Sequence, residues 1–251
     1  MKIIDSHMHL GGCSVFGFEI NEESLMLNLE NNKISAALVQ PFPGAQPDAK
    51  SVHNRIFALS KKSPKKIFGV ASINPNLNEK EVRYEIERCI KELNFVGIKC
   101  HTLGHAANPL LPAGDLIFKI ANQLKVPVIV HTGQGLVFGA PSLNILKARQ
   151  YPELTIILAH SGMMIFTPEA FVAASECKNI YLETSWNPAE DIEWLITSIG
   201  SGRVMFGSDS YTNSMLNQRV ELYKFEIMDI NKKQREDVLF NTTNKVFKLN
   251  L

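Results

Sequence analysis

Residues 2–9 read KIIDSHMH, a short run of apolar and β-branched residues that ends in histidine. Seven later stretches have the same character, and each is followed by a segment with helical periodicity. The starts of successive stretches lie 24 to 32 residues apart. Several stretches are almost wholly apolar, which is typical of parallel strands covered on both faces. The eight predicted strands are residues 2–9, 34–40, 66–73, 95–101, 126–131, 154–160, 179–184 and 203–209.

Eight strand–helix pairs in 251 residues predict an α/β protein, a (β/α)8 TIM barrel forming a single domain over residues 1–251. The alternative is an open, doubly wound sheet, which usually carries a glycine-rich phosphate loop after its first strand. Here residues 10–13 read LGGC, which lacks the G-x-G-x-x-G spacing. Among the helix starts, residues 187–190 (NPAE) predict a helix with Asn187 as its N-cap.

Composition excludes several function classes. Apolar residues make up 45% and charged residues 20% of the chain, and the net charge is +1, so no nucleic-acid or membrane partner is expected. No run of about 18 apolar residues exists, and Asp5 and His7 interrupt any signal-peptide core, so we expect a cytoplasmic protein. The four cysteines lack a Cys-x-x-Cys spacing. The expected partner is a small-molecule substrate, with homo-oligomerisation left open.

Histidines gather where the predicted strands end. In a TIM barrel those ends form one rim, where active sites lie. Alternate residues of a strand share a face, so His7 and His9 point the same way, as do Lys99 and His101. The other two histidines, His53 in a predicted helix and His105 in a loop, are expected to be surface, packing or turn residues. The polar residues at the rim are His7, His9, Lys99, His101, His131, His160 and Asp209.

Imidazole nitrogens and a carboxylate oxygen are the ligands that borderline metals prefer. Buried together without a cation, such a cluster would be costly. The rim therefore predicts a divalent metal ion, Zn²⁺ first and Mn²⁺ second.

The motifs on these strands resemble the amidohydrolase superfamily, and in particular the amidohydrolase-related branch that includes aminocarboxymuconate-semialdehyde decarboxylase. The motifs are DSHMHL, VASINP, VGIKCH, PVIVHTG, LAHSG and RVMFGSD, and they run from the first strand to the last. The resemblance implies a barrel that holds one or two divalent metals at its mouth. The residues that it implies as metal ligands are His7, His9, Lys99, His131, His160 and Asp209.

Two of these ligands have open roles. His160 either binds a second metal or hydrogen-bonds the metal-bound water. Lys99 matches the lysine that is carboxylated and bridges two ions in two-metal members. The alternative is a cationic Lys99 that holds an anionic substrate group or Glu183. We favour the bridging form because a nearby cation lowers the pKa of an amine, and a neutral amine reacts with CO₂.

The function predicted first is hydrolysis of a C–N or C–O acyl bond in an amide, lactam or lactone. Asp209 would move the proton of a metal-activated water, and His160 would stabilise the oxyanion. The alternatives are a metal-dependent lyase (a decarboxylase or hydratase) and a metal-binding protein without turnover. No arginine stands at a predicted strand end to hold a substrate carboxylate. The candidate substrate contacts are His101, Gln40, Phe42, Glu183, Trp186 and Tyr211.

Overall fold

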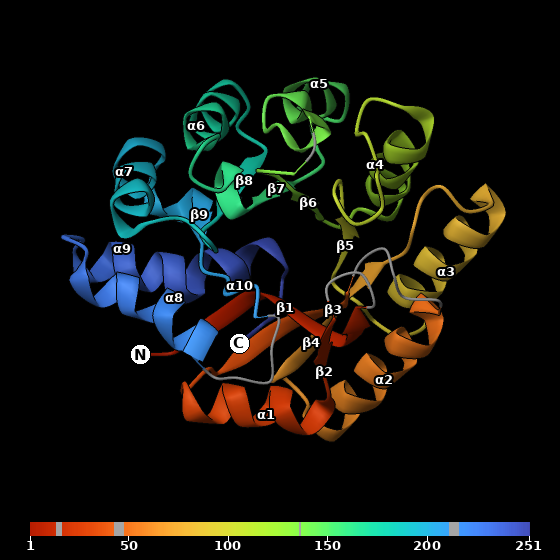
Figure 1. Ribbon diagram of the computed structural model, residues 1–251, viewed down its shortest axis with the longest axis horizontal. Coiled ribbons are helices and arrows are strands. Elements are labelled where there is room, and N and C mark those ends of the chain that lie inside the picture. Colours follow the sequence, from red (N-terminus) through yellow and green to blue (C-terminus); the bar gives the residue numbers. More distant parts are fainter. Residues whose placement is uncertain (14–16, 43–47, 136, 211–215) are drawn as a thin grey trace.

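The computed structural model spans residues 1–251 and describes all of them except 14–16, 43–47, 136 and 211–215. In the described residues, a nine-stranded sheet curls into a barrel with helices on its outside (Figure 1). The strands are β1 (Ile4–Cys13), β2 (Phe18–Ile20), β3 (Ala36–Pro41), β4 (Ile67–Ser72), β5 (Gly97–Cys100), β6 (Val128–His131), β7 (Ile156–Ala159), β8 (Ile180–Glu183) and β9 (Val204–Met205). The helices are α1 (Glu22–Asn31), α2 (Ala49–Lys62), α3 (Glu79–Lys91), α4 (Pro112–Leu124), α5 (Leu143–Gln150), α6 (Thr167–Glu176), α7 (Ala189–Ile199), α8 (Leu216–Ile227), α9 (Lys232–Glu236) and α10 (Thr242–Val246).

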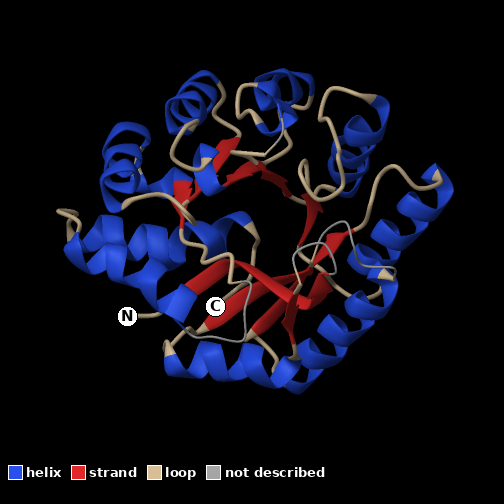
Figure 2. Ribbon diagram, in the orientation of Figure 1, coloured by secondary structure: helices blue, strands red, loops and turns tan. Residues whose placement is uncertain are grey.

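The eight predicted strands correspond to β1 and β3–β9, which pair in parallel in chain order and confirm the TIM barrel. Strand β2 is an addition, an antiparallel partner of the end of β1. The two ends of the sheet meet at a parallel bridge between Met8 and Ser210. Two backbone hydrogen bonds support this closure: Ser6 N–H donates to Phe206 (3.0 Å) and Asp209 N–H donates to His7 (2.9 Å). Figure 2 shows the strands as an inner ring enclosed by helices.

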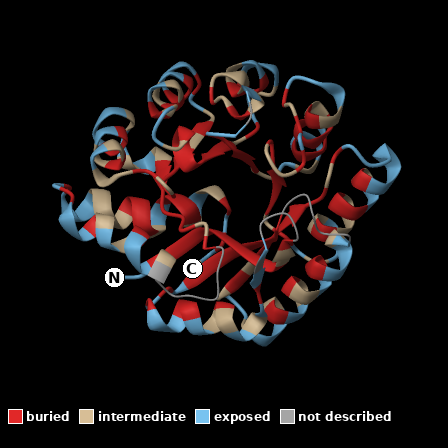
Figure 3. Ribbon diagram, in the orientation of Figure 1, coloured by how far each residue is buried: buried red, intermediate tan, exposed pale blue. Residues whose placement is uncertain are grey.

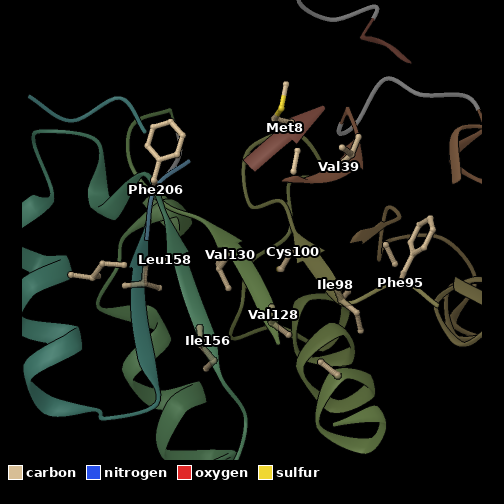
Figure 4. Close-up of a cluster of buried hydrophobic side chains, with 14 of the residues drawn as sticks. Met8, Val39, Phe95, Ile98, Cys100, Val128, Val130, Ile156, Leu158 and Phe206 are labelled. Carbon is tan, nitrogen blue, oxygen red and sulfur yellow. The ribbon is translucent and has the colours of Figure 1, made fainter. Parts of the chain in front are cut away.

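Outward-facing strand residues form the larger apolar core, between the sheet and the helices. Met8, Ile98 and Cys100 belong to it and are at most 1% exposed, as expected from their alternation with the polar rim residues. Figure 4 shows them with Val130 and Leu158 of the neighbouring strands. The long helices α2, α3 and α4 each bury the face that covers this layer and expose the other face (Figure 3).

A second apolar cluster fills the barrel interior at the amino-terminal ends of the strands. Phe247 and Leu249, which follow α10, pack into it and cover that end of the barrel. The strand residues of this cluster include Ile4, Leu38, Val70, Ile129, Ile157 and Met205. The polar interior residues therefore occupy only the opposite end, the mouth.

Strand β1 changes the phase of its side chains part-way along. Strict alternation would place Ile4 on the same face as Met8, yet Ile4 packs in the interior cluster and Met8 in the outer core. The pairing of β1 with β3 shifts register between Asp5 and Met8, which marks a bulge. The bulge allows Ile4, His7 and His9 all to face the interior.

The predicted N-cap of α7 is wrong. Pro188 occupies that position, and the Asn187 side chain is engaged with other loops. At the start of α9, Asn231 is the N-cap and forms a capping box with Gln234. None of the described helices combines the length and the apolar character needed to cross a membrane.

Candidate metal centre

The barrel mouth collects the imidazoles that the sequence placed at strand ends. His7 and His9 lie on β1, His131 ends β6, His160 follows β7, and His101 follows β5. All five are buried, with exposed fractions between 1% and 7%. Burial lowers the pKa of His131 to about 3 and also lowers the pKa of His9. The His131 and His9 rings are therefore neutral at pH 7 and keep a lone pair available for a metal.

One group of donor atoms comes from β1 and the segment after β9. Asp209 Oδ1 lies 2.9 Å from His9 Nε2 and 3.3 Å from His7 Nε2. The other ring nitrogens point elsewhere: His7 Nδ1 lies 3.0 Å from Glu183, and His9 Nδ1 lies 3.3 Å from the Pro41 carbonyl oxygen. Partners at Nδ1 fix both rings so that the two Nε2 atoms converge with the carboxylate.

The charge of Asp209 suits a cation. Burial alone would raise the pKa of Asp209, but the neighbouring His7 and His9 outweigh burial and hold it well below its usual range. Asp209 is therefore ionised, and its side chain is 19% exposed, so it has access to solvent.

A second group lies on the β6 and β7 side. His131 Nδ1 is 3.1 Å from His160 Nε2, and His160 Nδ1 is 2.7 Å from Ser185 Oγ. His131 Nε2 is buried and has no hydrogen-bond partner. The His131 ring stacks on His101, with centroids 4.5 Å apart. An unpartnered buried nitrogen is what a site built for a ligand leaves when the ligand is absent.

Lys99 lies between the polar groups, on β5. Its side chain is only 1% exposed, and Nζ lies 3.1 Å from His7 Nε2. Burial lowers the pKa of Lys99 to about 8. Among the described carboxylates, none forms an ion pair with it. His7 Nε2 cannot serve Lys99 and a metal at the same time, so the ammonium and a metal ion compete for this nitrogen.

A protein-family model described as Amidohydrolase matches residues 38–249, which is most of the chain. This chain belongs to the amidohydrolase family. His7 and His9 precede the matched region, whereas Lys99, His131, His160 and Asp209 fall within it. The family and the fold thus agree with the resemblance seen in the sequence.

Solved structures share the fold of this amidohydrolase at low identity. An uncharacterised TIM-barrel protein from Bordetella bronchiseptica has a TM-score of 0.79 and 17% identity, with 99% of each chain covered. A dihydroxybenzoic acid decarboxylase from Polaromonas, with bound manganese and the inhibitor 2-nitroresorcinol, has a TM-score of 0.76 and 19% identity over 100% of this chain and 98% of that one. A 2,6-dihydroxybenzoate decarboxylase from Rhizobium has a TM-score of 0.74 and 16% identity, with 100% and 99% covered. No curated protein sequence matches.

Glu183 of the amidohydrolase contacts other residues of the centre. It is 1% exposed, and its Oε2 accepts from the His160 backbone N–H (3.1 Å) and from Ser185 Oγ (2.9 Å), besides lying near His7. Its Oε1 accepts from the Ser185 backbone N–H at 2.6 Å. Ser185 is not among the predicted site residues, although it directly follows a predicted strand that ends in polar residues.

The remaining predicted substrate residues also lie at the mouth, where their contact with a substrate stays a prediction. Gln40 is 1% exposed, and neither atom of its amide group has a partner. Phe42 stacks on His9 with ring centroids 4.5 Å apart. His101 Nδ1 accepts from the Gly104 N–H (2.9 Å), and the indole N–H of Trp186 donates to Asp209 (2.7 Å). Tyr211 lies outside the described residues.

Proposed function

We propose that this amidohydrolase is a decarboxylase that holds a divalent metal ion at the barrel mouth and acts on a small carboxylic acid. The observation that carries the proposal is Lys99, a fully buried cation among the candidate ligands with no ion-paired carboxylate in the described chain. Asp209 and Glu183 act on Lys99 only from beyond ion-pair distance, and a substrate carboxylate would supply a counter-charge in direct contact. The two dihydroxybenzoate decarboxylases of the same fold support this choice.

The donor set fits a metal. The Nε2 atoms of His7 and His9 converge with Oδ1 of Asp209, and both rings are fixed through Nδ1. His131 Nε2 is buried without a hydrogen-bond partner. Imidazole and carboxylate donors suit Zn²⁺, the ion predicted first, and Mn²⁺, which the Polaromonas structure contains. We assign His7, His9, His131 and Asp209 as ligands. His160 and Lys99 would join them only with a second ion.

When bound, the ion supplies a Lewis acid that polarises substrate oxygens and stabilises developing negative charge. Glu183 and the Pro41 carbonyl orient His7 and His9 through their Nδ1 atoms. Of the two forms of Lys99 left open by the sequence, the proposal takes the ammonium, which orients the substrate carboxylate. As CO₂ leaves, its bonding electron pair stays on the substrate carbon, and a proton taken from solvent water replaces the carboxyl group. Asp209 and His160 are the groups placed to move that proton.

Hydrolysis, the function predicted first from the sequence, is the second candidate. The observation that favours it is the solvent access of Asp209, which would let its carboxylate accept a proton from water. Product analysis separates the two reactions because only hydrolysis adds water oxygen to the organic product.

The test uses chain loaded with Mn²⁺ or with Zn²⁺ in ¹⁸O-labelled water. A hydroxybenzoate panel that includes 2,6-dihydroxybenzoate is compared with a panel of lactones and amides. Release of CO₂ with no ¹⁸O in the organic product is expected, and the His9→Ala variant serves as the inactive control. Turnover of a lactone or amide with ¹⁸O incorporation, and no CO₂ from any acid, would replace decarboxylation with hydrolysis.

A further inference from the structure

The two carboxylate oxygens of Asp209 have separate partners. Oδ1 lies 2.9 Å from His9 Nε2 and 3.3 Å from His7 Nε2. Oδ2 accepts a hydrogen bond of 2.7 Å from the indole Nε1–H of Trp186, in the loop after β8. One oxygen therefore faces the imidazoles and the other faces the indole.

The backbone of Trp186 is in an unusual conformation for a bulky residue. Its φ is +66°, in the left-handed region, and such a conformation persists only where the surrounding structure enforces it. Strain of this kind at a site residue is a reason to look for a function.

The residues on either side of Trp186 hold this conformation. Ser185 N–H donates to Glu183 Oε1 at 2.6 Å. The Asn187 side chain donates to the His160 carbonyl oxygen (2.5 Å) and accepts from the Met164 N–H (2.9 Å). The loop is thus tied to the same strand ends that carry the candidate ligands, and the indole is held in place before any ligand binds.

We propose that Trp186 is a positioning residue that acts through Asp209. An indole N–H can donate but cannot accept, so it keeps Oδ2 of Asp209 as a hydrogen-bond acceptor. Only Oδ1 is then directed at the position of the metal. The carboxylate then binds through one oxygen, with its plane set by Trp186. This inference rests on the metal centre proposed above, and it assigns Trp186 a task other than the substrate contact predicted from the sequence.

The chain offers a matched control, because Trp194 is its second and last tryptophan. Trp194 lies on α7, is 39% exposed and packs against Phe171, with ring centroids 4.9 Å apart. Mn²⁺ affinity is measured by competition with a chelator. Trp186→Phe removes the N–H but keeps an aromatic ring, and we expect it to weaken binding about 10- to 100-fold, as loss of an outer partner of a ligand does. Trp194→Phe is expected to bind as the wild type does.

A double-mutant cycle separates positioning from general damage. If Trp186 acts through the carboxylate, Trp186→Phe has no further effect on Mn²⁺ affinity in an Asp209→Ala background, which has no acceptor for the indole N–H. An equal loss in both backgrounds, or wild-type affinity in Trp186→Phe, would overturn the proposal.

Fluorescence supplies a readout that does not depend on activity. In Trp194→Phe protein, Trp186 is the sole emitter, and Mn²⁺ is expected to quench it with the affinity found by competition. In Trp186→Phe protein, emission from Trp194 should stay unchanged on adding Mn²⁺. A wild-type chain that takes up neither Mn²⁺ nor Zn²⁺ would remove the proposed function and this inference together, whereas failure confined to the variants removes the inference alone.

Discussion

Two buried histidine–carboxylate pairs in this molecule look alike locally and differ in what surrounds them. His7 Nδ1 lies 3.0 Å from Glu183, and His53 Nδ1 lies 2.7 Å from Glu85. At His53 the second ring nitrogen accepts the Ser72 backbone N–H at 3.0 Å, so both nitrogens are used within the protein. At His7 the second nitrogen instead faces the interior of the barrel mouth, where Lys99 Nζ (3.1 Å) and Asp209 Oδ1 (3.3 Å) lie near it.

The carboxylates of the two pairs differ as well. Glu85 receives both a bidentate contact from Arg88 and the thiol of Cys89 at 3.5 Å. Burial raises the pKa of Cys89, so this thiol stays protonated and is a poor metal ligand. Three potential ligand types thus meet at His53, but partners within the protein already occupy both His53 nitrogens and the Glu85 carboxylate. The comparison shows that the direction of the second nitrogen, more than the presence of the pair, distinguishes a candidate ligand from a structural histidine.

The largest difference is expected in metal affinity. His9→Ala removes a direct donor, and we expect Mn²⁺ binding to fall by more than about 100-fold, beyond the effect of losing an outer partner. His53→Ala is expected to keep wild-type affinity per folded chain because its nitrogens are not available to a metal. Elemental analysis after dialysis checks both variants, and equal metal loss in the two would erase the distinction.

The free energy of unfolding, unlike metal affinity, is expected to depend on the His53–Glu85 pair. Glu85→Ala leaves His53 and Arg88 without their carboxylate, and breaking a buried pair in this way should lower the free energy of unfolding by about 3 kcal/mol. Urea unfolding of the metal-free protein measures the loss. The same variant should bind Mn²⁺ as the wild type does, and a weaker Mn²⁺ affinity would show that the two pairs are coupled.

Substitution of Lys99 tests what lies against Nε2 of His7 in the working enzyme. If Lys99 is an ammonium, Lys99→Met keeps one ion per chain and raises KM for carboxylate substrates about 10- to 100-fold, the loss of one charged hydrogen bond. If Lys99 is carboxylated and bridges two ions, the same change lowers the count from two ions to one. Lys147→Met is the matched control, since Lys147 is also buried but pairs with Asp115 on the barrel exterior.

The smallest expected effect is on stability at acid pH. Burial alone would raise the pKa of Glu85, but His53 and Arg88 outweigh it and lower the pKa to about 2 from 4.5. A depressed carboxyl pKa stabilises the fold above pH 4.5, and this contribution is lost as the pH falls toward 2. Glu85→Gln should therefore flatten the fall of the urea midpoint between pH 5 and pH 3. An unchanged slope would show that other carboxylates dominate acid unfolding.

The sequence predicted what depends on local periodicity. Eight strands were located, and alternation placed His7, His9 and Lys99 on the interior face, because these features repeat along the chain itself. The bulge between Asp5 and Met8 was not predicted, since it exists only as a register shift against β3.

Partners distant in sequence were also beyond prediction. His53 meets Glu85 across 32 residues, and nothing in the helix that carries His53 marks that contact. Asn187 had the local pattern of an N-cap, yet contacts to His160 and Met164 recruit its side chain instead. Long-range hydrogen bonds thus decided each of these positions.

Closure of the barrel has a consequence for the order of folding. The backbone bonds that join β1 to the segment after β9 link residues 200 or more positions apart, and the contact between His9 and Asp209 spans the same interval. Contacts at such separation form slowly, because the entropy of closing a long loop must be overcome first. The donor set of His7, His9 and Asp209 therefore assembles only when both ends of the chain have docked. Metal uptake should accordingly be among the last events of refolding, later than the recovery of helical circular dichroism, and a metal-sensitive dye would report that final step.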